Sequence, residues 1–362
     1  MFDIFPPQYT TPIFYNIILL IVLFVSAKLV AKGHIVQVSL KKDKISFLLL
    51  LFVILYIGFR PMSGGGFGDM YYYRFSFNNY ALGAEVEGSK DLLWEFFMKF
   101  CSTIMTDRFF FFFCAILYTS PLYIASKKWL GRGKYILFLM FIASFSFWPY
   151  GTNGIRNGIA TSIFILAISH ANKRYLTYSL LVISYSIHAS IAIPIAAYVL
   201  TLFYKNSKHY LLGWILCIPL SIFFGGYFEN LFALIGFEDD RISYLTQGNI
   251  NNDDFTYTGF RWDFLVYSAA TVFAGYYFII KRNFNDKIYI QLFNIYVTAN
   301  AFWILVIRAN FSNRFAYLSW FLMAAVIFYP FFKAKFFKNQ HKVLAYVILG
   351  YFGFTYFMFL IN

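Results

Sequence analysis

Long apolar segments recur along the whole length of this 362-residue chain. A run of about 20 apolar residues can cross a bilayer as a helix, and helices satisfy their own backbone hydrogen bonds where no water is present. Only 13% of the residues are charged, about half of the roughly 25% found in soluble proteins. We therefore predict an all-α polytopic membrane protein that forms a single transmembrane domain over residues 1–362.

The apolar pattern predicts about twelve transmembrane or re-entrant helices. They lie near residues 13–31, 45–59, 109–126, 134–149, 157–171, 174–187, 190–204, 210–225, 262–280, 288–307, 313–332 and 343–360. The stretch 175–204 is too long for one span and short for two, and the charges that follow it favour two arms that meet near His188. We expect that turn to line a cavity below the outer surface, because irregular backbone is tolerated there only inside protein or beside water.

Two long outer loops are expected, at residues 60–108 and 226–261. The first begins with a glycine-rich segment, Ser63–Asp69, and ends in an apolar-aromatic stretch, Leu92–Met98. We interpret that stretch as an interfacial helix on the outer leaflet. The second loop is acidic and rich in Asn, and we expect it to be a mobile cap over the outer site.

The basic residues divide unevenly between the two sides of the predicted membrane. With the N-terminus outside, the inner loops hold 20 of the 30 basic residues, and 17 of those 20 are Lys. The outer side holds the other ten, of which eight are Arg. Basic inner loops are the pattern expected of a multi-pass protein, so the net charge of +14 reflects topology and does not indicate nucleic acid.

Outer arginines at the starts of predicted helices indicate an anion site. A cation is disfavoured at a helix N-terminus, unless its guanidinium and the free backbone N–H groups together bind an anion. Arg156 and Arg314 begin helices with no acid in the same turn, whereas Arg108 and Arg261 have aspartates close by and are expected to form ion pairs with them. Because Arg binds phosphate through two N–H groups, we expect Arg156 and Arg314 to bind a lipid pyrophosphate; the alternative is contact with lipid headgroups.

Other outer residues are weaker candidates. Arg60 and Arg308 follow predicted helix C-termini, where the dipole favours a cation, and we expect both to assist at the pyrophosphate. Asp69 could orient an arginine or a sugar hydroxyl or act as a base, or it could form a plain ion pair with Arg60 or Arg74. His188 lies near the outer half of the membrane, where a polar residue indicates function, although a hydrogen bond between helices would also explain it. No metal-ligand spacing occurs, and we expect no cofactor.

Three segments resemble the EpsG-like and Wzy-like polysaccharide polymerases of bacterial inner membranes. The first is Arg60 followed by Gly68-Asp69 and the tyrosines 71–73; the second is the segment 155–160 with the later segment 185–190; the third is the segment 313–317. In the second segment, Asn157 stands where the family usually has Gln after the arginine.

The resemblance implies a membrane glycosyltransferase of the inner membrane with its site on the outer side. It would join undecaprenyl-pyrophosphate-linked repeat units into O-antigen, capsule or exopolysaccharide, with lipid pyrophosphate as the leaving group. His188 or Asp69 would be the catalytic base, and Arg74, Asn157 and Tyr317 would contact other parts of the substrate. Membrane lipid and a chain-length regulator protein are the other partners expected. A flippase for the lipid-linked unit and an O-antigen-type ligase remain the alternatives.

Overall fold

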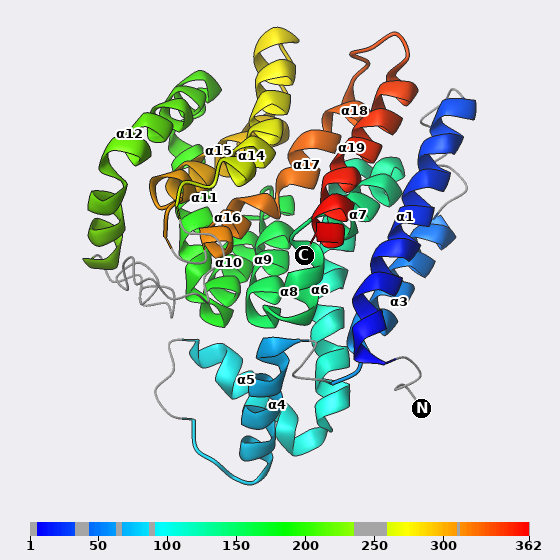
Figure 1. Ribbon diagram of the computed structural model, residues 1–362, viewed down its shortest axis with the longest axis vertical. Helices are drawn as coiled ribbons and strands as arrows, with labels where there is room; N and C mark the ends of the chain where they lie inside the picture. The colour runs from blue at the N-terminus through cyan, green and yellow to red at the C-terminus, as the bar shows by residue number, and fades with distance from the viewer. Residues whose placement is uncertain are drawn as a thin grey trace. The chain divides into compact units, whose positions relative to one another are not determined.

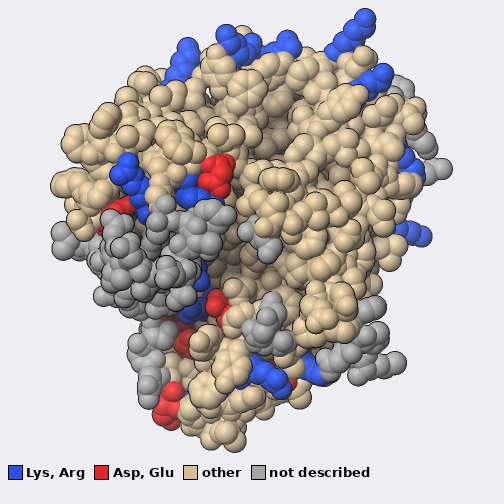
Figure 2. Space-filling model, viewed as in Figure 1, with Lys and Arg blue, Asp and Glu red and all other residues tan. Residues whose placement is uncertain are grey.

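A computed structural model describes residues 6–32, 43–62, 67–86, 91–234, 259–309 and 312–361, and every regular element in these ranges is a helix. The predicted all-α class is therefore confirmed. The glycine-rich residues 63–66 lie outside the described ranges. Uncharged side chains cover most of the face drawn in Figure 2, as expected for a surface that meets lipid.

Seven helical stretches of the described chain are long and apolar enough to cross a membrane. They are Pro7–Ala31, Asp107–Ile142, Ser207–Phe232, Trp262–Lys281, Lys287–Leu305, Ser312–Lys333 and Gln340–Ile361. Three shorter apolar helices accompany them, at Lys44–Gly58, Ile155–Ser169 and Ala189–Phe203. The chain is a membrane protein; each of the twelve predicted segments falls on helical structure, while the predicted number of about twelve spans is not confirmed.

Contact density divides the chain into two compact units. The first consists of Met1–His188 with Phe331–Asn362, and the second of Ala189–Pro330. In the first unit, α1 (Pro7–Lys32) runs beside α19 (Gln340–Ile361), as Figure 1 shows. The remaining helices of this unit are α3 (Asp43–Gly58), α4 (Gly68–Ala81), α5 (Leu92–Ile104), α6 (Asp107–Leu130), α7 (Lys134–Ile142), α8 (Phe147–Thr152), α9 (Ile155–Ser169) and α10 (Arg174–Ile187). The helix α9 packs on both α6 and α10.

The second unit is built around α15, which packs on five other helices of this unit. Its helices are α11 (Ala192–Phe203), α12 (Ser207–Leu234), α14 (Trp262–Gly275), α15 (Lys287–Leu305), α16 (Ser312–Trp320) and α17 (Met323–Phe328), and α18 (Pro330–Lys333) follows at the boundary. Buried Asn300 on α15 accepts a hydrogen bond from Trp214 Nε1 at 2.7 Å and donates one to Ser319 Oγ at 2.9 Å. Such polar contacts join helices inside a bilayer, where apolar side chains gain nothing over lipid.

The segment 175–204 forms two helices, as predicted. The first, α10, ends at His188, whose backbone is extended, and a short 3₁₀ turn at Ala189–Ile191 precedes α11. His188 therefore lies where regular helix is interrupted, at the end of the first unit.

The two predicted outer loops contain more helix than expected. Residues 60–108 contain α4 and α5, which pack against each other as a helical hairpin (Figure 1), and α5 includes the helix predicted near Leu92–Met98. The position of this segment on the outer side stays a prediction. The hairpin helix α4 has only two buried side chains, Met70 and Phe77, and such a short apolar pattern gives little periodic signal. The helix α12 extends to Leu234 and enters the predicted loop 226–261; the predicted cap at 235–258 lies outside the described residues.

Candidate functional site

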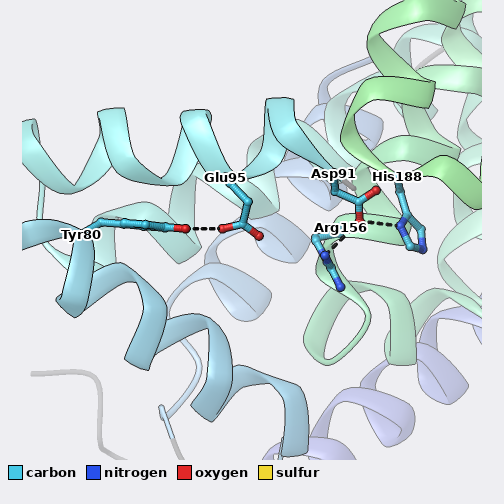
Figure 3. A network of polar contacts seen from close by, with 5 residues as sticks. All are labelled: Tyr80, Asp91, Glu95, Arg156 and His188. Carbon is cyan, nitrogen blue, oxygen red and sulfur yellow. Dashed lines mark hydrogen bonds and ion pairs between the residues drawn. The ribbon is translucent and has the colours of Figure 1, made fainter. Parts of the chain in front are cut away.

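The strongest polar cluster described in the first unit is centred on Asp91, immediately before α5. The Asp91 residue is 5% exposed. Its Oδ2 atom lies 2.9 Å from Arg156 NH1 and 3.0 Å from His188 Nδ1. Figure 3 shows the arginine and the histidine pointing to this one carboxylate from different helices. Burial of a carboxylate is costly unless donors surround it, and these two side chains supply them.

Arg156 is placed by the start of α9. Gly154 precedes the helix and Arg156 is its second residue, so the guanidinium leaves the chain where the first backbone N–H groups have no partner in the helix. The guanidinium also lies over the Tyr73 ring, at 5.9 Å from the centroid. Burial raises the pKa of the Tyr73 hydroxyl, and the charge of Arg156 lowers it in part. Tyr73 therefore stays protonated near neutral pH and remains a neutral neighbour of the cation.

The contact with Asp91 defines which His188 nitrogen carries the proton. An ionised carboxylate only accepts hydrogen bonds, so Nδ1 donates to Asp91 Oδ2 across 3.0 Å. In the neutral ring, Nε2 then carries the lone pair. His188 is 6% exposed and follows the last turn of α10. A histidine oriented in this way can accept a proton at Nε2.

A second polar contact extends the network along α5 (Figure 3). Glu95 accepts a hydrogen bond from the Tyr80 hydroxyl at 2.8 Å, which joins α5 to the end of α4. The charge of Glu95 also acts on Arg156. The hairpin of α4 and α5 thus places the carboxylates of Asp91 and Glu95 where both interact electrostatically with Arg156.

Asp69 and Asn157 lie beside this cluster. The Asp69 backbone N–H, at the start of α4, donates to Asn153 Oδ1 at 2.6 Å, and the Asp69 charge acts on Tyr73. Asn157 is 5% exposed, and its Oδ1 atom has no hydrogen-bond partner among the described residues. Asn157 follows Arg156 directly in the sequence, and Asp69 acts on Tyr73, whose ring lies under the Arg156 guanidinium. The predicted roles of Asp69 as a base and of Asn157 as a substrate contact remain predictions.

Arg60 occupies a different, fully interior position. It is 4% exposed and donates to the carbonyls of Ile57 at 2.6 Å and Thr152 at 2.8 Å. Its guanidinium lies over the Phe67 and Phe111 rings. Burial lowers the pKa of Arg60 to about 10, so the side chain still carries its charge near neutral pH. These contacts favour a structural role at the ends of α3 and α8, and the predicted contact with pyrophosphate remains a prediction.

One of the expected local ion pairs is present, and Asp107 forms another that was not predicted. Arg74 Nε lies 2.8 Å from Asp107 Oδ2, at the start of α6, so Asp107 rather than Asp69 pairs with Arg74. Arg261 NH2 lies 2.6 Å from Asp263 Oδ2, as the short spacing between them predicts. The Arg108 backbone N–H also donates to Asp107 Oδ1 at 2.8 Å. Arg74 is half exposed in its pair, and its predicted contact with substrate remains a prediction.

In the second unit, Arg308 contacts a kink in α12. The backbone of α12 is non-helical at Phe224, and Arg308 NH2 donates to the nearby Ile222 carbonyl at 2.9 Å. A carbonyl at a kink loses its regular partner, which explains the contact. The Glu229 side chain, about two turns beyond Ile222 along α12, interacts electrostatically with Arg308.

Arg314 and Tyr317 share the first turns of α16. The charges of Arg314 and Arg261 both act on the Tyr317 hydroxyl, and Asn313 forms a hydrogen bond with it. This unit therefore gathers two arginines around one tyrosine, at the starts of α14 and α16. Arg314 and Tyr317 were both predicted as substrate contacts, and these contacts remain predictions.

Sequence reasoning did not find Asp91. Its only signal is its position directly before the apolar stretch that begins at Leu92, which predicts an ordinary helix N-cap. The carboxylate makes no capping hydrogen bond to α5. Such a bond typically contributes about 1 kcal/mol, so the side chain gives up a stabilising contact in order to reach Arg156 and His188. The contacts of Asp91 with Arg156 and His188 form only when α5, α9 and α10 pack together, so no local pattern predicts them.

One comparison with known proteins gives a match. The profile of the EpsG family matches residues 44–362, which is most of the chain. No curated protein and no solved structure matches.

Proposed function

Because this chain belongs to the EpsG family of polysaccharide polymerases, we propose that it joins lipid-pyrophosphate-linked oligosaccharide repeat units at the outer face of the bacterial inner membrane. The meeting of Arg156 and His188 at one buried carboxylate is the observation that supports this chemistry. It brings an anion-binding group and a proton acceptor to one place, and glycosyl transfer from a lipid pyrophosphate requires both.

The proposed step exchanges one bond at the anomeric carbon. A hydroxyl oxygen of one lipid-linked unit attacks that carbon, and the bond between the carbon and the pyrophosphate oxygen breaks. The electron pair leaves with the undecaprenyl pyrophosphate, and the hydroxyl proton passes to His188 Nε2. General-base catalysis of this kind contributes roughly 10²–10⁴-fold to a rate.

Arg156 is proposed to bind the departing pyrophosphate. Charge develops on the leaving group as the bond breaks, and a fixed guanidinium lowers the barrier most where water is excluded. The start of α9 adds backbone N–H groups beside the side chain. From the sequence pattern alone, Arg314 remains a predicted pyrophosphate ligand and Arg308 an assisting one. Arg60 is the weakest of the predicted ligands because it donates to two backbone carbonyls, and Asp69 is retained as an alternative base. A chain-length regulator is a further proposed partner.

A deletion strain tests the reaction class. We expect the surface polysaccharide of such a strain to collapse, on a gel, from a ladder to a single rung. Single repeat units attached outside would show loss of a polymerase, and units trapped on the inner face would show loss of a flippase. Full-length polymer that remains on its lipid carrier would show loss of a ligase and would contradict the proposal.

Replacement of Arg156 by Lys tests the anion site. We expect Arg156→Lys to insert normally and to lose polymer by about 10²-fold, because Lys is a point charge and cannot bind phosphate through two parallel N–H groups. The measurement is polymer per molecule of protein in the complemented deletion strain. Arg174→Lys, at an exposed position at the start of α10, is the matched control and should behave as the parent protein.

A further inference from the structure

We propose that Asp91 is a positioning residue of the polymerisation site, which holds Arg156 and His188 in a working arrangement and whose charge opposes the binding of pyrophosphate to Arg156. This inference rests on the proposed function. Asp91 does not contact the reacting atoms in this proposal; it acts through the two side chains that do.

The first argument is the unusual use of an N-cap aspartate. Asp91 is the residue before α5, and its carbonyl accepts the Trp94 N–H at 2.9 Å in the ordinary way. Its carboxylate makes no hydrogen bond to the first turn of α5, and instead its Oδ2 atom meets Arg156 and His188. An aspartate at this position normally caps its own helix. Here the carboxylate instead forms hydrogen bonds with residues of two distant segments.

A single oxygen atom, Asp91 Oδ2, accepts hydrogen bonds from both Arg156 and His188. The exposed fractions of the side chains are 7% for Asp91, 8% for His188 and 25% for Arg156. The arginine is therefore the most accessible member and the one that a ligand reaches first. The histidine and the carboxylate are more deeply buried, in a setting where charged hydrogen bonds are stronger than in water.

The negative charge of Asp91 has two opposite effects, one on His188 and one on a bound pyrophosphate. A carboxylate that orients a histidine through Nδ1 fixes the tautomer that can accept a proton at Nε2. The same negative charge repels a pyrophosphate that binds to Arg156. Asp91 should therefore weaken the binding of lipid pyrophosphate while it speeds turnover. A residue with a merely structural role would not shift these two quantities in opposite directions.

The test compares Asp91→Asn with Asp91→Glu and with Glu85→Gln in the full-length protein. Glu85 pairs with Lys99 in the same hairpin and its side chain is 90% exposed, so Glu85→Gln is the matched loss of a carboxylate. We measure polymer per molecule in the complemented deletion strain, and the Kd of the purified variants for undecaprenyl pyrophosphate. We expect Asp91→Asn to lower polymer by about tenfold or more and to tighten binding several-fold, and Glu85→Gln to change neither.

Asp91→Glu keeps the charge and moves it outward by one methylene. We expect it to make more polymer than Asp91→Asn and less than the parent, with affinity close to that of the parent. If Asp91→Asn does not accumulate in the membrane, Asp91→Glu decides: reduced polymer per molecule supports the inference, and unchanged polymer overturns it. Normal polymer from Asp91→Asn, or weakened binding together with reduced polymer, also overturns it.

Failure of this inference differs from failure of the proposed function. If Arg156→Lys loses both polymer and affinity for undecaprenyl pyrophosphate while Asp91→Asn behaves as the parent, only the positioning role is wrong. If Arg156→Lys keeps both, the anion site itself is wrong, whatever Asp91→Asn does.

Discussion

Gly158 lies where α9 packs closely on α8. A Cβ atom at this position would lie 2.6 Å from the Tyr150 carbonyl oxygen and 3.2 Å from a Tyr118 ring carbon. The nearest of these atoms belongs to the backbone, which cannot rotate away. The glycine therefore allows the contact that holds the start of α9, and with it Arg156, beside the preceding turn.

Replacement of Gly158 by Ala should destabilise the protein by about 1–3 kcal/mol, because the extra methyl group forces the two segments apart. The measurement is the thermal unfolding temperature of the purified protein. Gly350→Ala, in α19, is the control, since a Cβ atom added there would meet nothing within 4 Å among the described residues. That change should be neutral or slightly stabilising, because Ala favours a helix by up to about 1 kcal/mol over Gly. An equal effect at both positions would contradict the close-packing argument.

The helix α5 has one face buried against the protein and one exposed face. Trp94, Met98 and Cys101 are buried against the protein. Leu92, Phe96, Phe100 and Ile104 recur every fourth residue and are exposed. Residues four apart share one face of a helix, so the outward face of α5 is an apolar stripe. In a membrane protein such a stripe is suited to the interface between headgroups and acyl chains.

A fluorescent label on single cysteines tests this orientation. In a chain whose native cysteines are replaced by Ala, a label at Phe96→Cys should be quenched by spin-labelled lipid and protected from iodide, because its face meets lipid. A label at Glu85→Cys, in the turn between α4 and α5, where the native side chain is 90% exposed, should show the reverse. Quenching of both labels by iodide alone would place α5 in water and would contradict the interfacial position.

At the scale of the whole molecule, Lys and Arg have different distributions. With the predicted topology, Lys dominates the inner loops and Arg the outer side. Lys in short inner loops sets the orientation during insertion. Arg156, Arg261 and Arg314 instead lie at the starts of helices, where a planar cation with several donors is useful. The topology and the proposed site therefore depend on each other, because an inverted chain would place Arg156 in the cytosol.

Labelling with a membrane-impermeant maleimide tests the topology. In spheroplasts, a cysteine at Glu85→Cys should react, because the hairpin of α4 and α5 is predicted to lie outside. A cysteine at Arg132→Cys, in the turn between α6 and α7, should react only after the membrane is permeabilised. The opposite pattern would invert the predicted topology and would remove the site from the outer face.

From the sequence alone came the membrane class, the twelve segments that fall on helical structure and two of the three residues in the Asp91 cluster. Apolar segments predict helices because the bilayer allows few other structures, and the break at His188 followed from length and charge. Arg156 was predicted because a cation is disfavoured at a helix start unless an anion binds there. His188 was predicted because a polar group near the membrane is costly and therefore informative.

The contacts of Asp91 with Arg156 and His188 follow from the packing of the helices and not from any local pattern in the sequence. Asp91 is 65 positions from Arg156 and 97 from His188 along the chain, and nothing local distinguishes it from an ordinary N-cap. The folded hairpin of α4 and α5 likewise depends on packing, since α4 has too few buried residues to show a clear period. A contact between distant segments is a property of how helices pack, and no local pattern in a single sequence records it.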